Sequence, residues 1–251
     1  MEREIVAILI DGDFYLRRAK YLWGEKSPKE RASELIAYCK RHLKEHSGNV
    51  EIYDHLYRIF FYDCPPSDKN VYHPLLKKDI CLKKSPTYTW RNAFHAELKR
   101  SRKVALRLGR LADHEFSFSL STDATKKLLN GTKRIEDLTE EDFVNNIGQK
   151  GVDMRLGLDI QSMALKHQVT KMILISGDSD FVPAAKQARR EGIDFVLDPL
   201  FAGISDDLSE HIDGLYSRCV NPHTSDASKD PLASNMVRLL KDRQARESKN
   251  E

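Results

Sequence analysis

The chain has 251 residues, of which 40% are hydrophobic and 31% are charged, and its formal net charge is +3. This composition suits one α/β domain with insertions, or a domain with a small appendage, and it excludes a globally disordered chain. The longest apolar run near the start covers residues 5–10, which is far too short to cross a membrane. The mildly basic balance is compatible with a nucleic-acid partner without requiring one.

The cysteines are too scattered for a disulfide framework, and none is paired at the spacing of zinc ligands. We therefore expect free thiols and a reducing, cytoplasmic compartment. The four positions are Cys39, Cys64, Cys81 and Cys219.

The first half of the chain predicts two strands with a helix between them. Residues 4–10 are mostly β-branched and lack polar alternation, which is typical of a strand buried on both faces in a parallel sheet. The run ends at the turn signal Asp11-Gly12-Asp13. Helical spacing of apolar residues follows over 28–44, and 57–62 predicts a second buried strand.

The middle of the chain is predicted to be an insertion, over about residues 67–148. Residues 89–99 have the pattern of a helix, and 104–120 alternate in places, which indicates extended structure in the form of a hairpin. Residues 121–148 are polar and read as a turn region, with a short capped helix at 138–142.

The last third alternates helices and buried strands. Helices are expected at 152–167, 181–191 and 206–217, with strands at 171–176 and 193–197. This alternation predicts an α/β fold with a mainly parallel, doubly wound central sheet. The α/β domain is expected to span 1–220, and 221–251 to form a polar tail with a short helix over 232–246.

Acidic residues follow two of the predicted strands. Asp11 ends the first strand, and Asp178 and Asp180 follow a later one within Ser-Gly-Asp-Ser-Asp-Phe. In open α/β sheets the functional crevice lies beyond the carboxyl ends of the strands, where the strand order reverses. If the two strands are neighbours there, Asp11 and Asp178 face each other, and Asp153 opens the helix before the second strand.

A divalent cation would relieve the repulsion between carboxylates gathered at one point. Oxygen ligands without histidine or cysteine favour Mg²⁺ or Mn²⁺, held by Asp11, Asp153 and Asp178 with Asp180 assisting directly or through water. Structural roles stay open beside this one. Asp11 suits a turn, Asp180 an N-cap, and Asp153 the first turn of a helix, where the helix dipole favours an acid.

Asp159 is left out of the predicted core site. It follows Asp153 by six residues, so an ideal helix points it away from the same face. It is expected to be a supporting residue, a salt-bridge partner or an exposed acid.

At these residues the chain resembles the NYN domain family, in the LabA-like branch of the PIN-like nucleases. The matching segments are Leu9-Ile10-Asp11-Gly12, then Lys150-Gly151-Val152-Asp153 with Asp159 following, and the run from Ile175 to Pro183. The resemblance covers residues 4–63 and about 148–217, and it implies a compact three-layer α/β/α domain that cleaves RNA with Mg²⁺ or Mn²⁺.

The resemblance carries the family's catalytic acids over to Asp11, Asp153, Asp178 and Asp180. Many members have an asparagine two residues after the glycine of the first motif, where this chain has Phe14. This difference bears on how the first motif would hold a metal ion or its water.

Cations beside aromatic side chains suggest a surface for single-stranded RNA, with single-stranded DNA as the alternative, because cations track the phosphates and rings stack on bases. A solvated surface with interspersed acids explains the same pattern. A homo-oligomer is compatible with the sequence, and no membrane partner is expected. The predicted nucleic-acid-binding residues are Arg17, Arg18, Lys83, Lys84, Trp90 and Arg91.

Two other functions compete with a metal-dependent endoribonuclease. The same fold can serve as a non-catalytic module that binds RNA or protein, since fold does not fix function. The spacing Asp11-Gly12-Asp13 also fits a phosphatase of the haloacid dehalogenase type, in which the first acid is a nucleophile. That class expects a small hydroxyl residue where Phe14 and Tyr15 stand, and a second late acid where Val182 stands.

Overall fold

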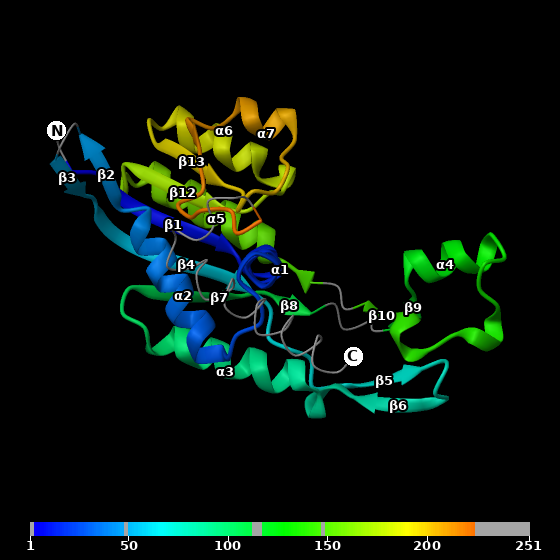
Figure 1. Ribbon diagram of the computed structural model, residues 1–251. Coiled ribbons are helices and arrows are strands. Elements are labelled where there is room, and N and C mark those ends of the chain that lie inside the picture. Colours follow the sequence, from blue (N-terminus) through cyan, green and yellow to red (C-terminus); the bar gives the residue numbers. More distant parts are fainter. Residues whose placement is uncertain (1–2, 48–49, 112–116, 147–148, 224–251) are drawn as a thin grey trace, which may run out of the picture.

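The computed structural model describes residues 3–47, 50–111, 117–146 and 149–223. At its centre is a six-stranded sheet in the order β14-β13-β12-β1-β4-β7, in which every neighbouring pair is parallel (Figure 1). The predicted parallel α/β fold is confirmed. The strands are β1 (Ile5–Asp11), β4 (His55–Asp63), β7 (Val104–Leu108), β12 (Lys171–Ile175), β13 (Asp194–Asp198) and β14 (Gly214–Leu215).

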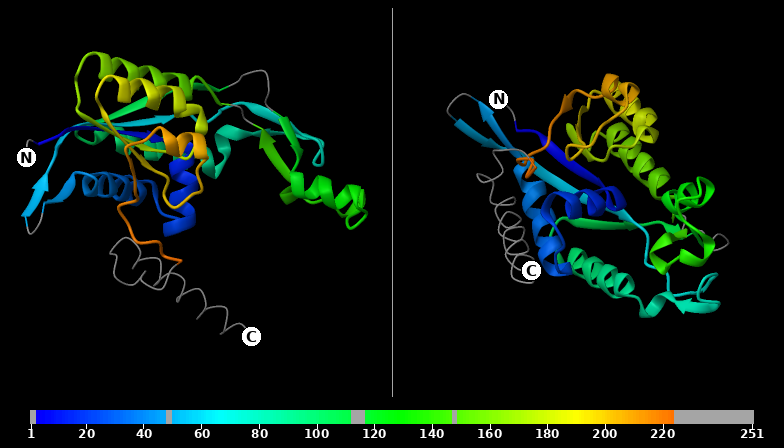
Figure 2. Two further views of the ribbon diagram at one scale, coloured as in Figure 1. Left: turned by 90° about the horizontal axis from the view of Figure 1, so that it is seen from above. Right: turned by 45° about the vertical axis from the view of Figure 1, so that its right-hand side comes forward.

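Helices cover both faces of this sheet and give the predicted three layers (Figures 1 and 2). One face carries α1 (Gly12–Trp23), α2 (Pro28–Arg41) and α3 (Pro86–Arg100). The other face carries α5 (Val152–Leu165), α6 (Val182–Arg190) and α7 (Asp206–Glu210).

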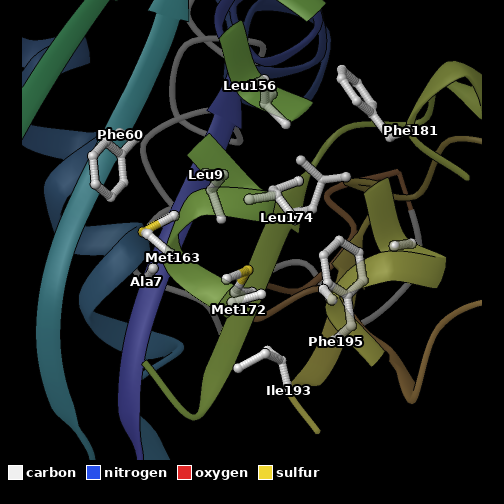
Figure 3. Packing of buried hydrophobic residues seen from close by; sticks show 14 of the residues in the cluster. Ala7, Leu9, Phe60, Leu156, Met163, Met172, Leu174, Phe181, Ile193 and Phe195 are labelled. Atoms are coloured by element: carbon white, nitrogen blue, oxygen red, sulfur yellow. The ribbon is translucent and has the colours of Figure 1, made fainter. Parts of the chain in front are cut away.

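The alternation of side chains along β1 divides the core in two. Val6, Ile8 and Ile10 pack against α1, α2 and α3, whereas Ala7 and Leu9 pack against α5 and α6 (Figure 3). All five side chains are fully buried, because successive residues of a strand point to opposite faces and both faces are covered. This burial explains why the strand is apolar throughout.

Local signals set the ends of several helices. Ser27 and Glu30 form a capping box at the start of α2, where Pro28 occupies the first turn and needs no backbone donor. After α6, Gly192 has a φ of 80°, a left-handed conformation that glycine adopts without strain.

Small elements extend from the sheet between β4 and α5. We call the arm the pieces β5 (Asn70–His73), β6 (Lys78–Cys81), β9 (Ser117–Leu120), α4 (Thr122–Leu129) and β10 (Phe143–Asn146), which project away from the sheet (Figures 1 and 2). The ring of buried His73 lies 4.5 Å from Phe118 and 5.0 Å from Phe143, so aromatic contacts join the two hairpins of the arm.

Further short elements complete the described chain. They are the hairpin of β2 (Lys44–Ser47) and β3 (Val50–Tyr53), the pair β8 (Arg110–Leu111) and β11 (Gln149–Lys150), and the single turns η1 (Leu82–Lys84), η2 (Ile135–Asp137), η3 (Glu140–Asp142) and η4 (Ser179–Phe181).

Three expectations for the chain need correction. The hairpin expected within 104–120 is wrong, because β7 pairs in parallel with β4 and β9 pairs with β10. The last helix ends at Glu210 instead of residue 217, because Gly214–Leu215 form the edge strand β14. Helix α1 was not predicted at all. The helix expected over 232–246 lies outside the described residues.

The segment expected to be an insertion contains two parts of the central layers. Helix α3 packs on the sheet beside α2, and β7 forms one edge of the sheet. The elements that leave the sheet are therefore the arm and the β8–β11 pair. All four cysteines are free thiols, as expected.

Candidate functional site

The strand order reverses between β1 and β12, the place at which the sequence predicts a crevice. These strands pair in parallel with Ile10 opposite Ile175, so Asp11 and Ser176 are the next residues on each strand. The Ser176 hydroxyl donates to Asp11 Oδ2 at 3.3 Å, and the Asp178 amide donates to Ser176 Oγ at 3.3 Å. Buried Ser176 therefore ties the two predicted acidic segments together.

Asp11 is held in place by the start of α1. It is the N-cap residue, and its Oδ1 accepts from the Phe14 amide at 3.2 Å. The pKa of Asp11 is raised to about 6, chiefly by burial and then by the nearby carboxylates of Asp13 and Asp153, against the opposing hydrogen bonds from Phe14 and Ser176. Asp11 is thus a partly buried acid with other acids beside it.

Gly12 allows the chain to turn from β1 into α1 at close quarters. A Cβ atom on Gly12 would lie 2.4 Å from the Tyr62 carbonyl oxygen and 2.6 Å from Cε1 of Phe61. Any larger residue would push α1 away from β4 and move Asp11, so the glycine of the first motif has a steric role.

Asp153 comes from the first turn of α5, which runs antiparallel to the strands and so begins at the same edge of the sheet. Gly151 has a φ of 76° at the N-cap of this helix. Below it, a Cβ on Gly109 would lie 2.7 Å from Cγ2 of Val152, so the chain after β7 supports the start of α5. Asp153 is exposed, and its pKa is raised by partial desolvation and then by the carboxylates of Asp178 and Asp180.

Asp178 and Asp180 lie in the loop after β12, and both are exposed. Asp178 is the N-cap of η4, with its Oδ1 accepting from the Asp180 amide at 3.0 Å. The N-cap role expected for Asp180 is wrong, since Phe181 is the N-cap residue of α6 and no side chain caps this helix. The Asp180 carboxylate caps no helix, and its negative charge contributes to the raised pKa of Asp153.

Phe14 occupies the position where many NYN domains have asparagine. It packs against the loop that carries Asp178, because a Cβ on Gly177 would lie 3.0 Å from Cε2 of Phe14. Phe14 therefore adds an apolar contact between the two acidic segments, and it brings no metal ligand there.

Together the four acids offer a metal only oxygen donors. Among the described residues, no three acids of this crevice bring their carboxylate oxygens within 4.8 Å of one another. The possible ligand atoms of Asp207, Glu210 and His211, on and beside α7, do lie within that distance. Mg²⁺ usually keeps several waters and is bound through one or two carboxylates, so the wider spacing fits a hydrated ion better than a fully ligated one. The pKa values of Asp11 and Asp153 are raised first by burial and then by neighbouring carboxylates, and a cation would relieve the repulsion between those carboxylates.

Asp159 lies outside this group, as predicted. Its Oδ2 accepts from the Tyr62 hydroxyl at 2.8 Å and from Arg107 Nε at 3.1 Å. It is a salt-bridge partner that joins α5 to β4 and β7.

The predicted nucleic-acid-binding residues separate into three places. Arg17 is exposed, while Arg18 donates to the Leu200 carbonyl at 2.6 and 3.1 Å. Lys83 and Lys84 are exposed in η1. Trp90 is half-buried: its Nε1 donates to the Lys26 carbonyl at 2.9 Å, and its ring stacks on Phe94.

Arg91 connects two acids that the sequence did not link. Its Nη2 lies 3.0 Å from Asp13 Oδ1, and its Nη1 lies 2.6 Å from Asp63 Oδ1. Arg17, Trp90 and Arg91 line one cavity of about 560 Å³ between α1 and α3. The structure therefore gathers these three of the six predicted residues.

Sequence reasoning missed Asp63 and Asp198, the buried acids that end β4 and β13. Each directly follows a buried strand, which is the signal that identified Asp11. Ser176 was missed as well, although it occupies the position on β12 that matches Asp11 on β1.

These features define a doubly wound α/β protein with an acidic crevice at its switch point. The family model of the NYN domain matches residues 119–214, and this match confirms the predicted resemblance to the NYN domain family. NYN domains are PIN-like nucleases, a superfamily that generally uses divalent metals. The match includes Asp153, Asp178 and Asp180, whereas β1 and Asp11 precede it.

Among solved structures, a protein of unknown function from Vibrio parahaemolyticus has a TM-score of 0.43 and 14% sequence identity to this chain. The alignment covers 86% of this chain and 94% of that one. No curated protein matches the chain. In the described residues, no helix combines the length and the apolar character needed to cross a membrane.

Proposed function

We propose that the protein is a metal-dependent nuclease that hydrolyses phosphodiester bonds in single-stranded RNA. The observation that carries this proposal is the meeting of Asp11, Asp153 and Asp178, from three separate segments, at the switch point of a NYN domain. Burial and then the Asp153 carboxylate raise the pKa of Asp11, and burial and then the Asp178 carboxylate raise that of Asp153, which supports a shared location for the three acids. Carboxylates whose pKa is raised by burial and by neighbouring carboxylates, as at Asp11 and Asp153, are candidates for a functional site.

Mg²⁺ or Mn²⁺ would be held by Asp11, Asp153 and Asp178, with Asp180 beside them, and it supplies charge neutralisation and an activated water. The protein supplies orientation. Ser176 and the Phe14 amide hold the Asp11 carboxylate, and the Asp180 amide holds that of Asp178. These hydrogen bonds leave the remaining lone pairs of both carboxylates for the crevice.

Cations beside the crevice favour a nucleic-acid substrate. Arg17 and Arg91 lie next to Asp13 at the start of α1, two residues after Asp11. We expect these arginines to neutralise the phosphates that flank a cut bond. The four free thiols support a reducing, cytoplasmic location, which is part of this proposal. We also propose that the protein belongs to the LabA-like branch.

The NYN match disfavours the phosphatase alternative. Asp13, the second acid of the Asp-x-Asp spacing, is also engaged by both Arg17 and Arg91. A non-catalytic RNA-binding module remains the second candidate, and the spacing of the acids beyond 4.8 Å is the observation in its favour.

The test incubates the full-length protein with labelled single-stranded RNA and DNA in Mg²⁺, Mn²⁺ or a chelator. We expect RNA cleavage with either ion and none with the chelator. Asp178→Asn should lower the rate at least about 100-fold, since it removes a charge that acts at the transition state. Asp207→Asn is the matched control, because it alters an exposed aspartate in the other acidic group.

Unchanged cleavage by Asp178→Asn would contradict the proposed centre. Loss of cleavage in Asp207→Asn, with unchanged cleavage in Asp178→Asn, would assign the metal site to the acidic group at α7. Metal-independent binding of RNA without cutting, in both ions, would favour the binding module.

A further inference from the structure

Two cavities adjoin beside the acidic crevice, and they differ in chemistry. The first, of about 560 Å³, lies between α1 and α3, and the second, of about 370 Å³, lies between the start of α3 and the chain after β4. Thr87 and Arg91 line both, so the cavities share a wall. Asp13, whose charge raises the pKa of Asp11, lines the second cavity.

The first cavity is cationic. Its lining has five cations and one acid, Glu25. Lys26 and Arg31 share a single buried carboxylate, that of Glu34, so one positive charge remains uncompensated there. The five cations are Arg17, Lys20, Lys26, Arg31 and Arg91.

Burial makes part of this charge a fixed feature of the fold. The Arg31 side chain is 3% exposed, and it also donates to the Gly24 carbonyl at the end of α1. Arg31 therefore contributes a fixed positive charge to the lining, and the exposed Arg17 and Lys20 are the cations that can contact an anion directly. A phosphate group is the ligand that suits such a lining.

The second cavity is mostly apolar. Cys64, Leu82 and Leu111 contribute apolar surface, and Tyr88 contributes an aromatic ring. Arg91 and Asp13 are its charged lining residues, and they are ion-paired to each other at 3.0 Å. This lining suits a flat, mostly apolar group with a polar edge, and the cavity is large enough for one nucleobase.

We propose that these adjoining cavities bind one unpaired nucleotide of a single-stranded nucleic acid, with its base beside Tyr88 and its phosphate among the cations. This inference rests on the proposed function, since it specifies the substrate of that crevice. A base in a duplex is paired and stacked, so it cannot enter the cavity without leaving the stack. Single strands should therefore bind more tightly than duplexes.

The test measures binding of the full-length protein in a chelator, which separates binding from cleavage. Fluorescence anisotropy compares a single-stranded RNA, the DNA of the same sequence, a duplex, and an abasic DNA strand that keeps its phosphates. The wild type should bind the abasic strand about 10-fold more weakly than the base-containing DNA, from the loss of one stacked base.

Tyr88→Ala should bind the base-containing strand as weakly as the wild type binds the abasic strand, and it should no longer distinguish the two. Tyr88→Phe keeps the ring and should restore the difference, which shows that the fold is intact. Lys20→Glu should weaken binding of both strands alike. Lys166→Glu, an equal charge change at the far end of α5, should leave both affinities unchanged.

Equal affinity of the wild type for the base-containing and abasic strands would overturn the nucleotide site, as would a duplex that binds as tightly as a single strand. The RNA and DNA arms decide which single strand is preferred. Base-dependent binding without cleavage would refute the nuclease and leave the nucleotide site standing. Cleavage together with base-independent binding would refute the nucleotide site and leave the proposed nuclease standing.

Discussion

Acids stand at the carboxyl ends of four neighbouring strands, β13, β12, β1 and β4, and they fall into two kinds. The outer acids, Asp63 and Asp198, are fully buried and surrounded by donors. The inner acids, Asp11 and Asp178, have other carboxylates near them, either directly or through Asp153. All four acids lie at the same edge of the sheet, so the groups around each acid distinguish the structural acids from those that we propose for the reaction.

The outer acids are structural because every side is occupied. Asp198 accepts from the Leu200 amide at 2.9 Å and the Ser217 hydroxyl at 2.6 Å, and it also contacts Tyr38 and His42. Asp63 is bound in the same way, by Arg91, His95 and the Cys64 amide. Neither carboxylate has room for a metal ion.

Removal of an outer acid should produce the largest effect. Asp198→Ala leaves Tyr38, His42 and Ser217 without their acceptor in a buried place, so the free energy of unfolding should fall by about 3–5 kcal/mol. Urea unfolding followed by circular dichroism measures this loss. A loss below about 1 kcal/mol would show that the network contributes little, and the contrast between inner and outer acids would fail.

Removal of an inner acid should lower the rate of RNA cleavage without lowering the stability of the fold. Asp11→Asn should lower RNA cleavage at least about 100-fold. Its free energy of unfolding should stay equal or rise, because asparagine still caps α1 and the charge next to Asp153 is gone. Cleavage assays and urea unfolding test the two halves separately. Asp11→Ala is the control, and loss of the cap should make it about 1 kcal/mol less stable than Asp11→Asn.

The pH dependence of stability sharpens the same contrast with a smaller effect. The pKa of Asp11 is about 6 in the folded chain against an ordinary value of 3.8, so the folded state holds a proton that the unfolded state has lost between these values. The contribution of Asp11 to the free energy of unfolding is therefore fully present below about pH 4, and it is lost as the pH rises to about 6. The slope is at most about 1.4 kcal/mol per pH unit.

Unfolding of the metal-free wild type and of Asp11→Asn at several pH values between 4 and 7 measures this term. The wild type should lose stability relative to the variant as pH rises, and the difference should level off above pH 6. A constant difference over this range would place Asp11 in an ordinary, solvated environment.

The acidic segments could be predicted because they carry local signals. A buried parallel strand reads as an unbroken apolar run, and the acid that follows it must lie at the carboxyl edge of the sheet. Helix α5 and the strand β12 were also predicted, since their periodicity is clear, and this placed Asp153 at the same edge. The reversal of strand order then brought Asp11 and Asp178 together.

Helix α1 was missed because Asp11-Gly12-Asp13 reads as a turn. The same residues begin a helix, whose buried face has the readable spacing of Tyr15, Ala19, Leu22 and Trp23. The role of Arg91 could not have been predicted, because its bridge to Asp13 spans 78 residues and depends on tertiary packing. The same holds for Asp63, whose partners come from α3.

The pairing of β1 with β12 joins the beginning of the chain to a segment 165 residues later. During synthesis the N-terminal part is made first, and its strand β1 can pair with β4 long before β12 has left the ribosome. Until then Asp11 has neither Ser176 nor the Asp178 loop beside it. A nascent chain therefore carries no assembled acidic crevice until β12 and the Asp178 loop have emerged and paired with β1.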